Sequence, residues 1–321
     1  MKSSIFITRK LPEAIVKSLE HHFEIKMWEE EDTPVPRSVL LKEIQDVEGI
    51  YCLLTDTIDE EVIKGAPNLK VISNMAVGFN NIDIQAAEQQ GIVVTNTPGV
   101  LTETTADLTF TLLMSTARRI VEASDYLRNG NWDTWSPMLL TGQEIHGSTL
   151  GIIGLGRIGE AVAKRAKGFG MNLLYYNRTR KFEKEEEIGI QYADLDTLLK
   201  ESDFVCVMIP YSPKVHHFIG KDELALMKPN AIVINTSRGG IVDEEALYES
   251  LVNKQIWGAG LDVFEEEPVS TNHPLLSLSN VVTLPHIGSA SVNTRLKMAQ
   301  LAADNIIHVL NDKSPLTPVN S

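Results

Sequence analysis

The sequence has few cysteines and no surplus of basic residues. Of its 321 residues only two are cysteines, Cys52 and Cys206, and both stand in strand-like apolar runs, where a thiol is usually a small buried side chain. They predict neither a disulfide framework nor a metal site. Lysine and arginine number 29 against 43 acidic residues, a net charge of -14, which repels nucleic acid and anionic lipid. We therefore expect no nucleic-acid or membrane partner, and an anionic ligand needs locally placed arginines.

Long apolar runs are also missing. No stretch approaches the roughly 20 apolar residues that cross a bilayer, because polar residues interrupt every run. The apolar stretch before Arg9 and Lys10 is too short for the core of a signal peptide. The composition, 43% hydrophobic and 22% charged, is that of an ordinary globular protein, and we expect a cytoplasmic one. The charged run at 181–187 (KFEKEEE) is expected to be a solvated helix face.

What the sequence does contain is an alternation of short apolar runs and amphipathic stretches. The runs lack a period of two, as strands buried on both faces do, so the pattern predicts α/β structure with parallel sheets, and the length suits two domains. The first series of predicted strands covers residues 5–8, 50–54, 70–73 and 92–95. The second series covers residues 149–154, 172–176, 203–209, 231–235, 258–263 and 280–284.

Two helical patterns frame the second series. Residues 101–130 predict one long helix that begins at Thr102 or Glu103, ends at Asn129-Gly130 and bridges the two domains. Residues 291–310 predict an amphipathic helix after the last strand. We expect this last helix to pack back on the first domain, which makes that domain discontinuous.

A glycine-rich turn follows the first strand of the second series. Residues 149–159 read TLGIIGLGRIG, a buried strand that runs directly into G-x-G-x-x-G. In such a turn Gly154 allows the bend, Gly156 lets the backbone approach a pyrophosphate, and Gly159 lets the following helix pack on the strand. The amide end of that helix faces the anion. The predicted cofactor-binding residues here are Gly154, Gly156, Arg157, Ile158 and Gly159.

The segment after the next strand indicates which dinucleotide is bound. NAD-selective folds usually carry an acid there for the adenosine ribose, but this chain reads Asn177-Arg178-Thr179-Arg180. Two guanidiniums and a hydroxyl suit a 2′-phosphate. We predict that NADP(H) is preferred, and the use of NAD(H) stays open. The alternative is that Arg178 and Arg180 are solvated loop charges without a ligand.

Three polar residues follow later strands of the second series: Arg238, Glu267 and His286. Ligands of open α/β sheets bind outside the carboxyl ends of the strands, so the three side chains can converge. Taken singly, they could be a turn residue, one of several solvated acids and a loop histidine. Together they form the set that carbonyl reduction requires, which is a cation for a carboxylate, a proton donor and an acid that orients the donor.

Six segments, in order along nearly the whole chain, resemble motifs of the D-isomer-specific 2-hydroxyacid dehydrogenases, and among these the glyoxylate and hydroxypyruvate reductases. The segments are AVGFNNIDIQAA (76–87), NTPGVLTETTADLTFTLLM (96–114), GIIGLGRIGEAVA (151–163), NTSRGGIVDEEAL (235–247), GLDVFEEEP (260–268) and PHIGSAS (285–291).

The resemblance implies the architecture and the reaction. Two doubly wound parallel-sheet domains are expected: a flavodoxin-like substrate-binding domain from residues 1–99 and 288–321, and a Rossmann NAD(P)-binding domain inserted at 100–287, with a cleft between them. The enzyme would be an oxidoreductase that reduces a small 2-oxo acid, glyoxylate or hydroxypyruvate, to the 2-hydroxy acid with NADPH. The product is the D-isomer where it is chiral.

The resemblance also assigns roles to single residues. His286 is the proton donor, Glu267 is its partner and favours the charged imidazolium, and Arg238 holds the carboxylate and carbonyl of the substrate. Glu267 is chosen among three adjacent acids because it immediately precedes Pro268, where the family keeps its acid. Further substrate-binding residues are Val77, Gly78 and Ser289, and candidate pocket residues are Leu53, Met75 and Trp135. Further cofactor-binding residues are Pro210, Thr236 and Asp262, the last on the nicotinamide carboxamide unless it merely ends a strand.

The loop at 131–140 (NWDTWSPMLL) holds two tryptophans, Trp132 and Trp135. Packing within the chain is the interpretation that the sequence favours for them. In the reductases that the chain resembles, the corresponding loop lies near a dimer interface and reaches the neighbouring active site. The resemblance therefore implies a homodimer in which Trp135 shapes the substrate pocket.

Three other functions compete with this hypothesis. A nucleotide-sensing regulator on the same fold would bind NADPH and a partner protein without turnover, but the set Arg238, Glu267 and His286 is intact. A dehydrogenase of formate or phosphite is a second alternative, and formate enzymes of this fold carry glutamine where Glu267 stands. A dehydrogenase of a bulkier 2-oxo acid is the third, since such substrates share the anchor and differ in pocket volume.

Overall fold

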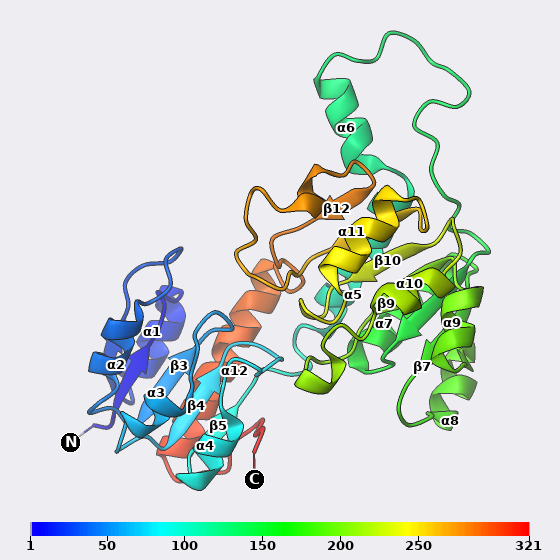
Figure 1. The fold of residues 1–321 in the computed structure, drawn as a ribbon. Helices are drawn as coiled ribbons and strands as arrows, with labels where there is room; N and C mark the ends of the chain where they lie inside the picture. The colour runs from blue at the N-terminus through cyan, green and yellow to red at the C-terminus, as the bar shows by residue number, and fades with distance from the viewer. Residues whose placement is uncertain (1, 321) are drawn as a thin grey trace. The chain divides into compact units, whose positions relative to one another are not determined.

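The computed structural model describes residues 2–320, which form two units, each with its own parallel sheet (Figure 1). One unit ends at Leu101 and resumes at Ala290, and the other spans Thr102–Ser289. The expected boundaries fell at 99/100 and 287/288. The fold class predicted from the sequence, two parallel-sheet α/β domains with one interrupted by the other, is confirmed.

The sheet of the first unit has five strands, and every neighbouring pair is parallel. The four predicted strands are present with ends shifted by one or two residues, whereas the edge strand β2 was not predicted. The order across the sheet is β2 (Glu24–Met27), β1 (Ser4–Ile7), β3 (Gly49–Cys52), β4 (Val71–Asn74) and β5 (Val93–Thr95).

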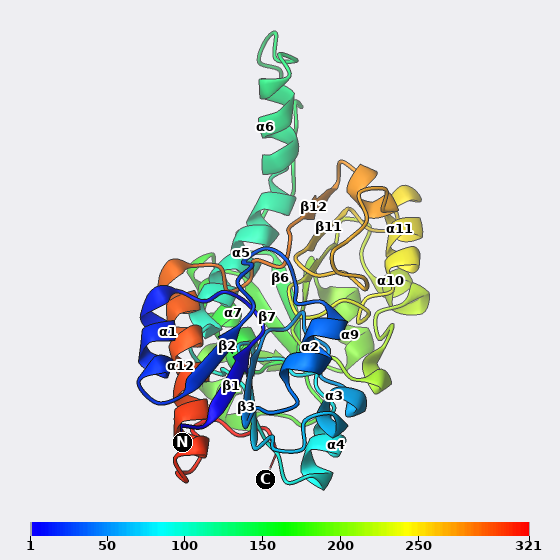
Figure 2. The ribbon, with the colours of Figure 1, turned by 90° about the vertical axis from the view of Figure 1, so that its left-hand side faces the viewer.

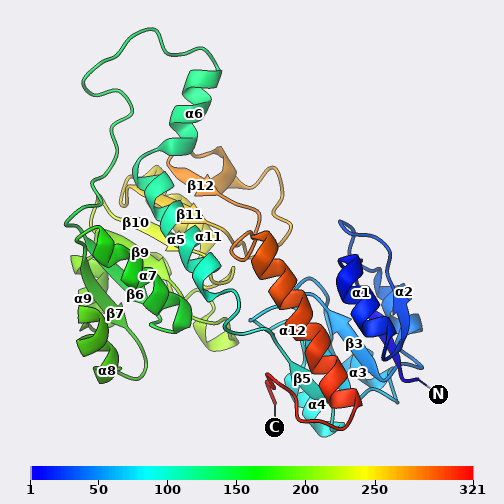
Figure 3. The same ribbon diagram turned by 180° about the vertical axis from the view of Figure 1, so that it is seen from behind.

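Helices cover both faces of this sheet. On one face, side chains of α2 (Arg37–Glu43), α3 (Glu60–Lys64) and α4 (Ile84–Gln89) form a core with the strands. On the other face lie α1 (Glu13–Glu20) and α12 (Val292–Leu310), and α12 runs along β3 and β4 (Figure 3). The hydroxyl of Tyr51 donates to Ala299 O at 3.2 Å, and that of Ser73 donates to Ala302 O at 2.8 Å. The predicted return of the last helix to the first unit is therefore correct.

The sheet of the second unit has seven strands, all parallel. All six predicted strands are present, and only the two-residue strand β8 was missed. The chain moves outward from β6 to β8 and then returns to β9 on the other side of β6, which creates a switch point at the carboxyl ends of β6 and β9. The order is β12 (Val281–Thr283), β11 (Gly258–Leu261), β10 (Ile232–Asn235), β9 (Phe204–Val207), β6 (Thr149–Ile153), β7 (Asn172–Tyr176) and β8 (Gln191–Tyr192).

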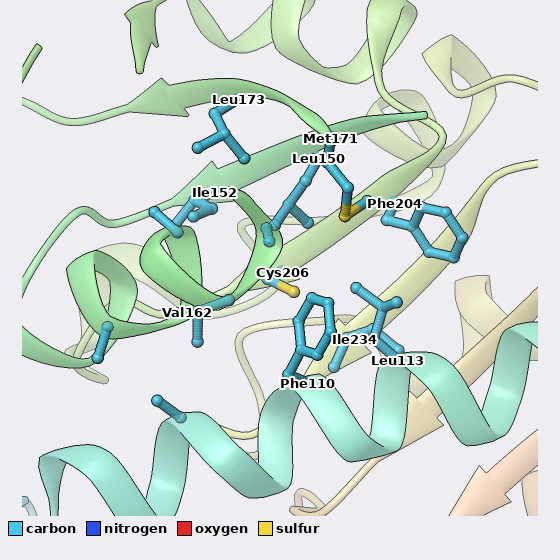
Figure 4. Close-up of a cluster of buried hydrophobic side chains, with 14 of the residues drawn as sticks. Phe110, Leu113, Leu150, Ile152, Val162, Met171, Leu173, Phe204, Cys206 and Ile234 are labelled. Carbon is cyan, nitrogen blue, oxygen red and sulfur yellow. The ribbon is translucent and has the colours of Figure 1, made fainter. Parts of the chain in front are cut away.

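Two apolar layers flank this second sheet. In one layer α5 (Thr102–Ala117) and α7 (Arg157–Gly168) pack on the strands, with Phe110 and Val162 against Ile152 and Ile234 (Figure 4). Cys206 lies in this layer, and both it and Cys52 are buried free thiols, as predicted. The other layer is formed by α9 (Leu195–Glu201), α10 (Lys221–Leu226) and α11 (Glu244–Val252). Short turns complete the unit: α8 (Phe182–Lys184), the π-helical turn η1 (Glu185–Gly189) and the 3₁₀ turns η2 (Pro213–Val215) and η3 (Pro274–Ser277).

The single helix predicted over residues 101–130 is wrong. The structure has α5 and then α6 (Ile120–Arg128), separated at Arg119, whose φ of 52° is left-handed. The carbonyl of Ala117 accepts the N–H of Gln143 at 2.8 Å, so it is not available to continue the helical ladder. Both helices belong to the second unit, because the unit begins at Thr102.

The segment from α6 through the following loop projects from the sheet of its unit (Figure 2). None of the side chains of α6 is buried. In the loop, Trp132 is 55% exposed, Trp135 74% and Met138 76%. The expectation that the tryptophans pack within the chain is therefore wrong. Among residues 2–320 there is no helix with the length and apolarity to span a bilayer.

Candidate active site

The glycine turn joins β6 to α7, and two of its three glycines have a steric reason within the protein. Gly154 has φ of 103°, and a Cβ there would lie 2.9 Å from the carbonyl of Met208. A Cβ on Gly159 would lie 2.4 Å from Gly154 O, whereas one on Gly156 would meet nothing within 4 Å. The turn is thus closed on the protein side and open at Gly156, where a ligand can approach the backbone.

The start of α7 suits a negatively charged ligand. Gly156 is the N-cap and supplies no side chain to the first-turn N–H groups, which have no intrahelical acceptors. The exposed Arg157 and the half-buried Ile158 occupy this first turn. A diphosphate would satisfy these amides and align with the helix dipole. The residues present therefore fit the dinucleotide that the motif predicts.

Asn177 ties the end of β7 to this turn. Its Oδ1 accepts the N–H of Leu155 at 2.8 Å, and the N–H of Gly154 donates to Tyr176 O at 2.9 Å. Arg178, Thr179 and Arg180 follow directly and are exposed. The segment predicted to select the cofactor therefore lies beside the open side of the glycine turn.

The ends of β9, β10 and β11 bring the remaining cofactor candidates to the same edge of the sheet. Thr236 is buried, and its hydroxyl lies 2.7 Å from that of Thr109 and 3.7 Å from Met208 Sδ. Pro210, which follows β9, is exposed. Thr236 and Pro210 therefore follow the carboxyl ends of neighbouring strands, where the wall of a cofactor site is predicted.

Asp262 lies at the end of β11 and is buried. Its Oδ1 accepts the N–H of Ile287 at 2.8 Å, while its Oδ2 has no hydrogen-bond partner among residues 2–320. Burial raises the pKa of this carboxyl, against the bond from Ile287, the charge of His286 and the nearby N–H of Gly288. An unpaired buried acceptor is costly. A role for Oδ2 in accepting the N–H of a ligand amide therefore explains Asp262 better than the alternative that this residue merely ends a strand.

His286 and Glu267 form a hydrogen-bonded pair. Nδ1 of His286 lies 2.6 Å from Oε2 of Glu267, and Oε1 of the same carboxylate accepts the N–H of Phe264 at 3.0 Å. Burial raises the pKa of Glu267, but the hydrogen bond and charge of His286 outweigh burial, and the net pKa lies below the usual value. Glu267 therefore stays ionised beside the imidazole over the neutral range.

Arg238 lies close to this pair. Its carbonyl accepts from Asn235 Nδ2 at 2.9 Å, and its Nη1 donates to Ser237 O at 2.7 Å. Burial lowers the pKa of the guanidinium, and the charge of Glu267 raises it. A Cβ on the neighbouring Gly239 would lie 1.7 Å from Phe264 O, so the two loops are in backbone contact. The structure thus brings the three predicted catalytic residues together within one unit.

The predicted substrate anchor Val77 and Gly78 lies in the other unit. Asn96 Nδ2 donates to Val77 O at 2.8 Å, and Asn74 Nδ2 donates to Gly78 O at 2.9 Å. Both carbonyls are therefore engaged, whereas the N–H groups of Val77 and Gly78 have no acceptor in the part of the chain that is described. Two amides of this kind suit a carboxylate.

Asn74, Asn81 and Asn96 are functional candidates that the sequence did not reveal. Asn81 Nδ2 donates to Leu53 O at 3.1 Å and to Asp56 O at 2.9 Å. Asparagine is common in loops, and no spacing marks these three. Of the other predicted residues near this loop, Leu53 is half-buried and Met75 is buried. Ser289 is half-buried and is the last residue of the second unit.

The comparisons with known proteins agree with this geometry. Residues 110–288 match the family model described as "D-isomer specific 2-hydroxyacid dehydrogenase, NAD binding domain". The chain is 52% identical to a glyoxylate reductase of Thermococcus litoralis, with 100% of this chain and 97% of that protein covered, and 49% identical to one of Korarchaeum cryptofilum, with 100% and 96% covered. It superposes with a TM-score of 0.89 on an NADPH-dependent glyoxylate/hydroxypyruvate reductase of Sinorhizobium meliloti solved with NADP and malonate, at 35% identity and with 99% and 97% of the chains covered.

Proposed function

Since the chain belongs to the D-isomer specific 2-hydroxyacid dehydrogenases, a family of oxidoreductases, we propose that it reduces glyoxylate or hydroxypyruvate with NADPH. The observation that carries the proposal is the hydrogen-bonded pair His286–Glu267 with Arg238 beside it. The names of the relatives support the substrate class, because the two archaeal proteins are glyoxylate reductases that match over the whole chain.

The residues divide the work of carbonyl reduction. A bound reduced nicotinamide supplies the hydride to the carbonyl carbon. His286 gives its proton from Nε2 to the carbonyl oxygen, because its Nδ1 is engaged by Glu267. Glu267 stabilises the imidazolium before this transfer. Arg238 holds the carboxylate of the substrate in a planar, charged fork. The amides of Val77 and Gly78 are kept as the further substrate-binding residues that the resemblance implies.

The test is an assay of NADPH oxidation with a panel of 2-oxo acids, in wild-type enzyme and in His286→Ala. We expect turnover of glyoxylate and hydroxypyruvate, and a loss of about 10²- to 10⁴-fold in the variant, the usual contribution of general acid catalysis. Wild-type turnover in His286→Ala would refute the role of the histidine. Turnover confined to larger 2-oxo acids would favour the bulkier-substrate enzyme, and tight NADPH binding with no turnover of any acid would favour the sensor.

The cofactor preference rests on Arg178 and the absence of an acid at Asn177. Arg178 is exposed and has no hydrogen bond or ion pair within residues 2–320, so its charge is available to a 2′-phosphate. We expect kcat/KM for NADPH to exceed that for NADH, and Arg178→Asp to reverse the order. A ratio below one in the wild type would contradict the preference.

We also infer a homodimer formed through the projecting segment. A groove of about 950 Å³ lies beside it, lined among others by Val121, Tyr126, Trp257 and Leu276. Together with the exposed Trp132, Trp135 and Met138, the groove offers apolar side chains that a second copy of the chain would cover. Sedimentation should give a dimer that Trp132→Ser/Trp135→Ser dissociates. A wild-type monomer would remove the inference.

We propose that the enzyme is cytoplasmic, and the two free buried thiols are in keeping with that location.

A further inference from the structure

The two arginines in the loop that follows β7 differ in their contacts. Arg178 is exposed and has no partner in the described chain, whereas Arg180 Nε and Nη2 donate to Glu185 Oε1 and Oε2 at 2.7 Å each. The pair is bidentate, the geometry in which guanidinium and carboxylate bind most strongly. Only one of the two guanidiniums predicted to meet a 2′-phosphate is therefore unpaired.

Glu185 is not the solvated acid that the run KFEKEEE predicts. Its side chain is only 17% exposed. The hydroxyl of Tyr175 donates to Glu185 Oε1 at 2.8 Å and accepts the N–H of Lys181 at 2.7 Å. The bond from Arg180 lowers the pKa of the Glu185 carboxyl, so it is charged at neutral pH. The buried Tyr175, which is itself held by the N–H of Lys181, thus positions this carboxylate.

Aromatic rings contact Arg180, the cation of this ion pair. The guanidinium of Arg180 lies 4.6 Å from the ring centre of Phe182 and 5.5 Å from that of Tyr192. Cation–π contacts and the carboxylate together favour this position of Arg180 before any ligand arrives. A phosphate that recruits Arg180 has to compete with partners that are already arranged.

We propose that Glu185 sets the cofactor preference of this enzyme by occupying Arg180, so that Arg178 alone discriminates the 2′-phosphate of NADPH from the 2′-hydroxyl of NADH. A carboxylate beside Arg180 cancels its charge and repels a phosphate dianion, but has little effect on an uncharged hydroxyl. Glu185 therefore lowers the affinity for NADPH and leaves the affinity for NADH unchanged. The inference rests on the proposed binding of the adenosine ribose beside Arg178.

The experiment measures dissociation constants of NADPH and NADH by fluorescence titration, without substrate, for Arg178→Met, Arg180→Met and Glu185→Gln. Arg178→Met should weaken NADPH binding by about 10-fold or more, the range of a charge-assisted hydrogen bond. Arg180→Met should change it by less than about threefold, and Glu185→Gln should strengthen it by roughly three- to fivefold, as for an exposed charge pair. NADH binding should change little in all three variants.

Two controls isolate the effect. Glu187→Gln removes a carboxylate of the same segment that pairs with Lys184 and Lys164 rather than with Arg180, and it should leave the ratio of the two constants unchanged. In the double variant Arg180→Met/Glu185→Gln the gain of Glu185→Gln should disappear. The melting temperatures of the cofactor-free single and double variants should be non-additive, because the ion pair is already formed without ligand.

The outcomes separate the inference from the proposed function. If Arg178→Met leaves NADPH binding unchanged, the proposed preference for NADPH fails. If Arg178→Met weakens NADPH binding and Arg180→Met weakens it equally, Arg180 is available to the phosphate and the inference alone is overturned. An unchanged ratio in Glu185→Gln, or additive melting temperatures, also overturns it.

Discussion

Glu267 uses its two oxygens for two different purposes: Oε1 accepts the N–H of Phe264 at 3.0 Å, and Oε2 lies 2.6 Å from Nδ1 of His286. The backbone bond prevents rotation of the carboxylate, and the carboxylate in turn fixes the imidazole ring. The proton for the substrate must then leave from Nε2. Pro268 follows Glu267 and Gly239 packs on Phe264, so the loop that orients the histidine is itself held by the arginine loop.

Glu267→Gln should lower kcat for the reduction of glyoxylate. The pKa of Glu267 lies below its usual value, so its carboxylate is charged in the neutral range. The amide lacks that charge and can place an N–H₂ group where Oε2 now meets Nδ1 of His286, so the imidazole is less well oriented as a proton donor. We expect kcat to fall by up to about 10²-fold, part of the contribution of general acid catalysis, with a smaller change in KM for NADPH. An unchanged kcat would mean that another group orients the histidine.

Asp262→Asn should weaken the binding of NADPH and of NADH equally. The substitution keeps the volume but can put an amide N–H₂ where Oδ2 now offers an unpaired acceptor. A buried donor facing a carboxamide donor costs about 1–3 kcal/mol, or roughly 10-fold or more in affinity. Titrations should give similar losses for NADPH and NADH, unlike those expected for Arg178→Met. A loss confined to one cofactor would contradict a role at the nicotinamide end.

Affinity for both cofactors should also fall on acidification in the wild type. Burial raises the pKa of Asp262, so this carboxyl takes up a proton at higher pH than an ordinary aspartate. Protonation changes the charge of the acceptor that the carboxamide meets. Titration of NADH across acidic pH should show the weakening in wild-type enzyme, and Asp262→Asn should remove this pH dependence.

Asn96→Ala should raise KM for the 2-oxo acid and leave kcat nearly unchanged. The side chain holds Val77 O at 2.8 Å, and without it the loop can turn the amide of Gly78 away from a carboxylate. The loss of one hydrogen bond to a charged group is worth about 1.5–3 kcal/mol, so we expect KM to rise about 10- to 10²-fold. Asn172→Ala is the control, because it removes the same kind of asparagine-to-carbonyl bond, to Gly147 O at 3.2 Å, in the other unit. A fall in kcat at constant KM would assign Asn96 to catalysis or stability instead.

The fold was predictable where a segment has a continuous pattern of buried residues. Strands such as β7 are continuous apolar runs because helices cover both of their faces, and its predicted bounds agree with the structure. β2 escaped prediction because it is an edge strand with none of its residues fully buried. The break between α5 and α6 has no glycine or proline to mark it. The break depends on Gln143, which is distant in sequence and whose N–H donates to the carbonyl of Ala117.

The site was predictable where it follows the ends of strands. Gly154, Arg238 and His286 lie there, and the motifs around them are local. The partners that arrange the site are not local: Asn96 braces Val77 from the next strand, and Glu185 reaches back to Arg180 from a π-helical turn. A charge run such as KFEKEEE contains no sign of which acid is buried, because that depends on Tyr175 in the sheet.

Gly239→Ala should damage catalysis and stability together. A Cβ at this position would lie 1.7 Å from Phe264 O and 2.5 Å from Glu265 N, which are backbone atoms and cannot move aside as a flexible side chain can. Relief of the clash must separate the Arg238 loop from the loop that carries Glu267. Overpacking of this kind typically costs about 1–3 kcal/mol or more, and kcat should fall because Arg238 and His286 no longer face one substrate.

Gly168→Ala is the matched control, because a Cβ there would meet nothing within 4 Å and the residue is the last of α7. Alanine at that position should stabilise the enzyme by about 0.4–1 kcal/mol, through the lower entropy of the unfolded chain, and leave kcat unchanged. Thermal unfolding and steady-state assays of the two variants make the comparison. Full activity in Gly239→Ala would mean that the contact between the two loops is not required for the catalytic arrangement.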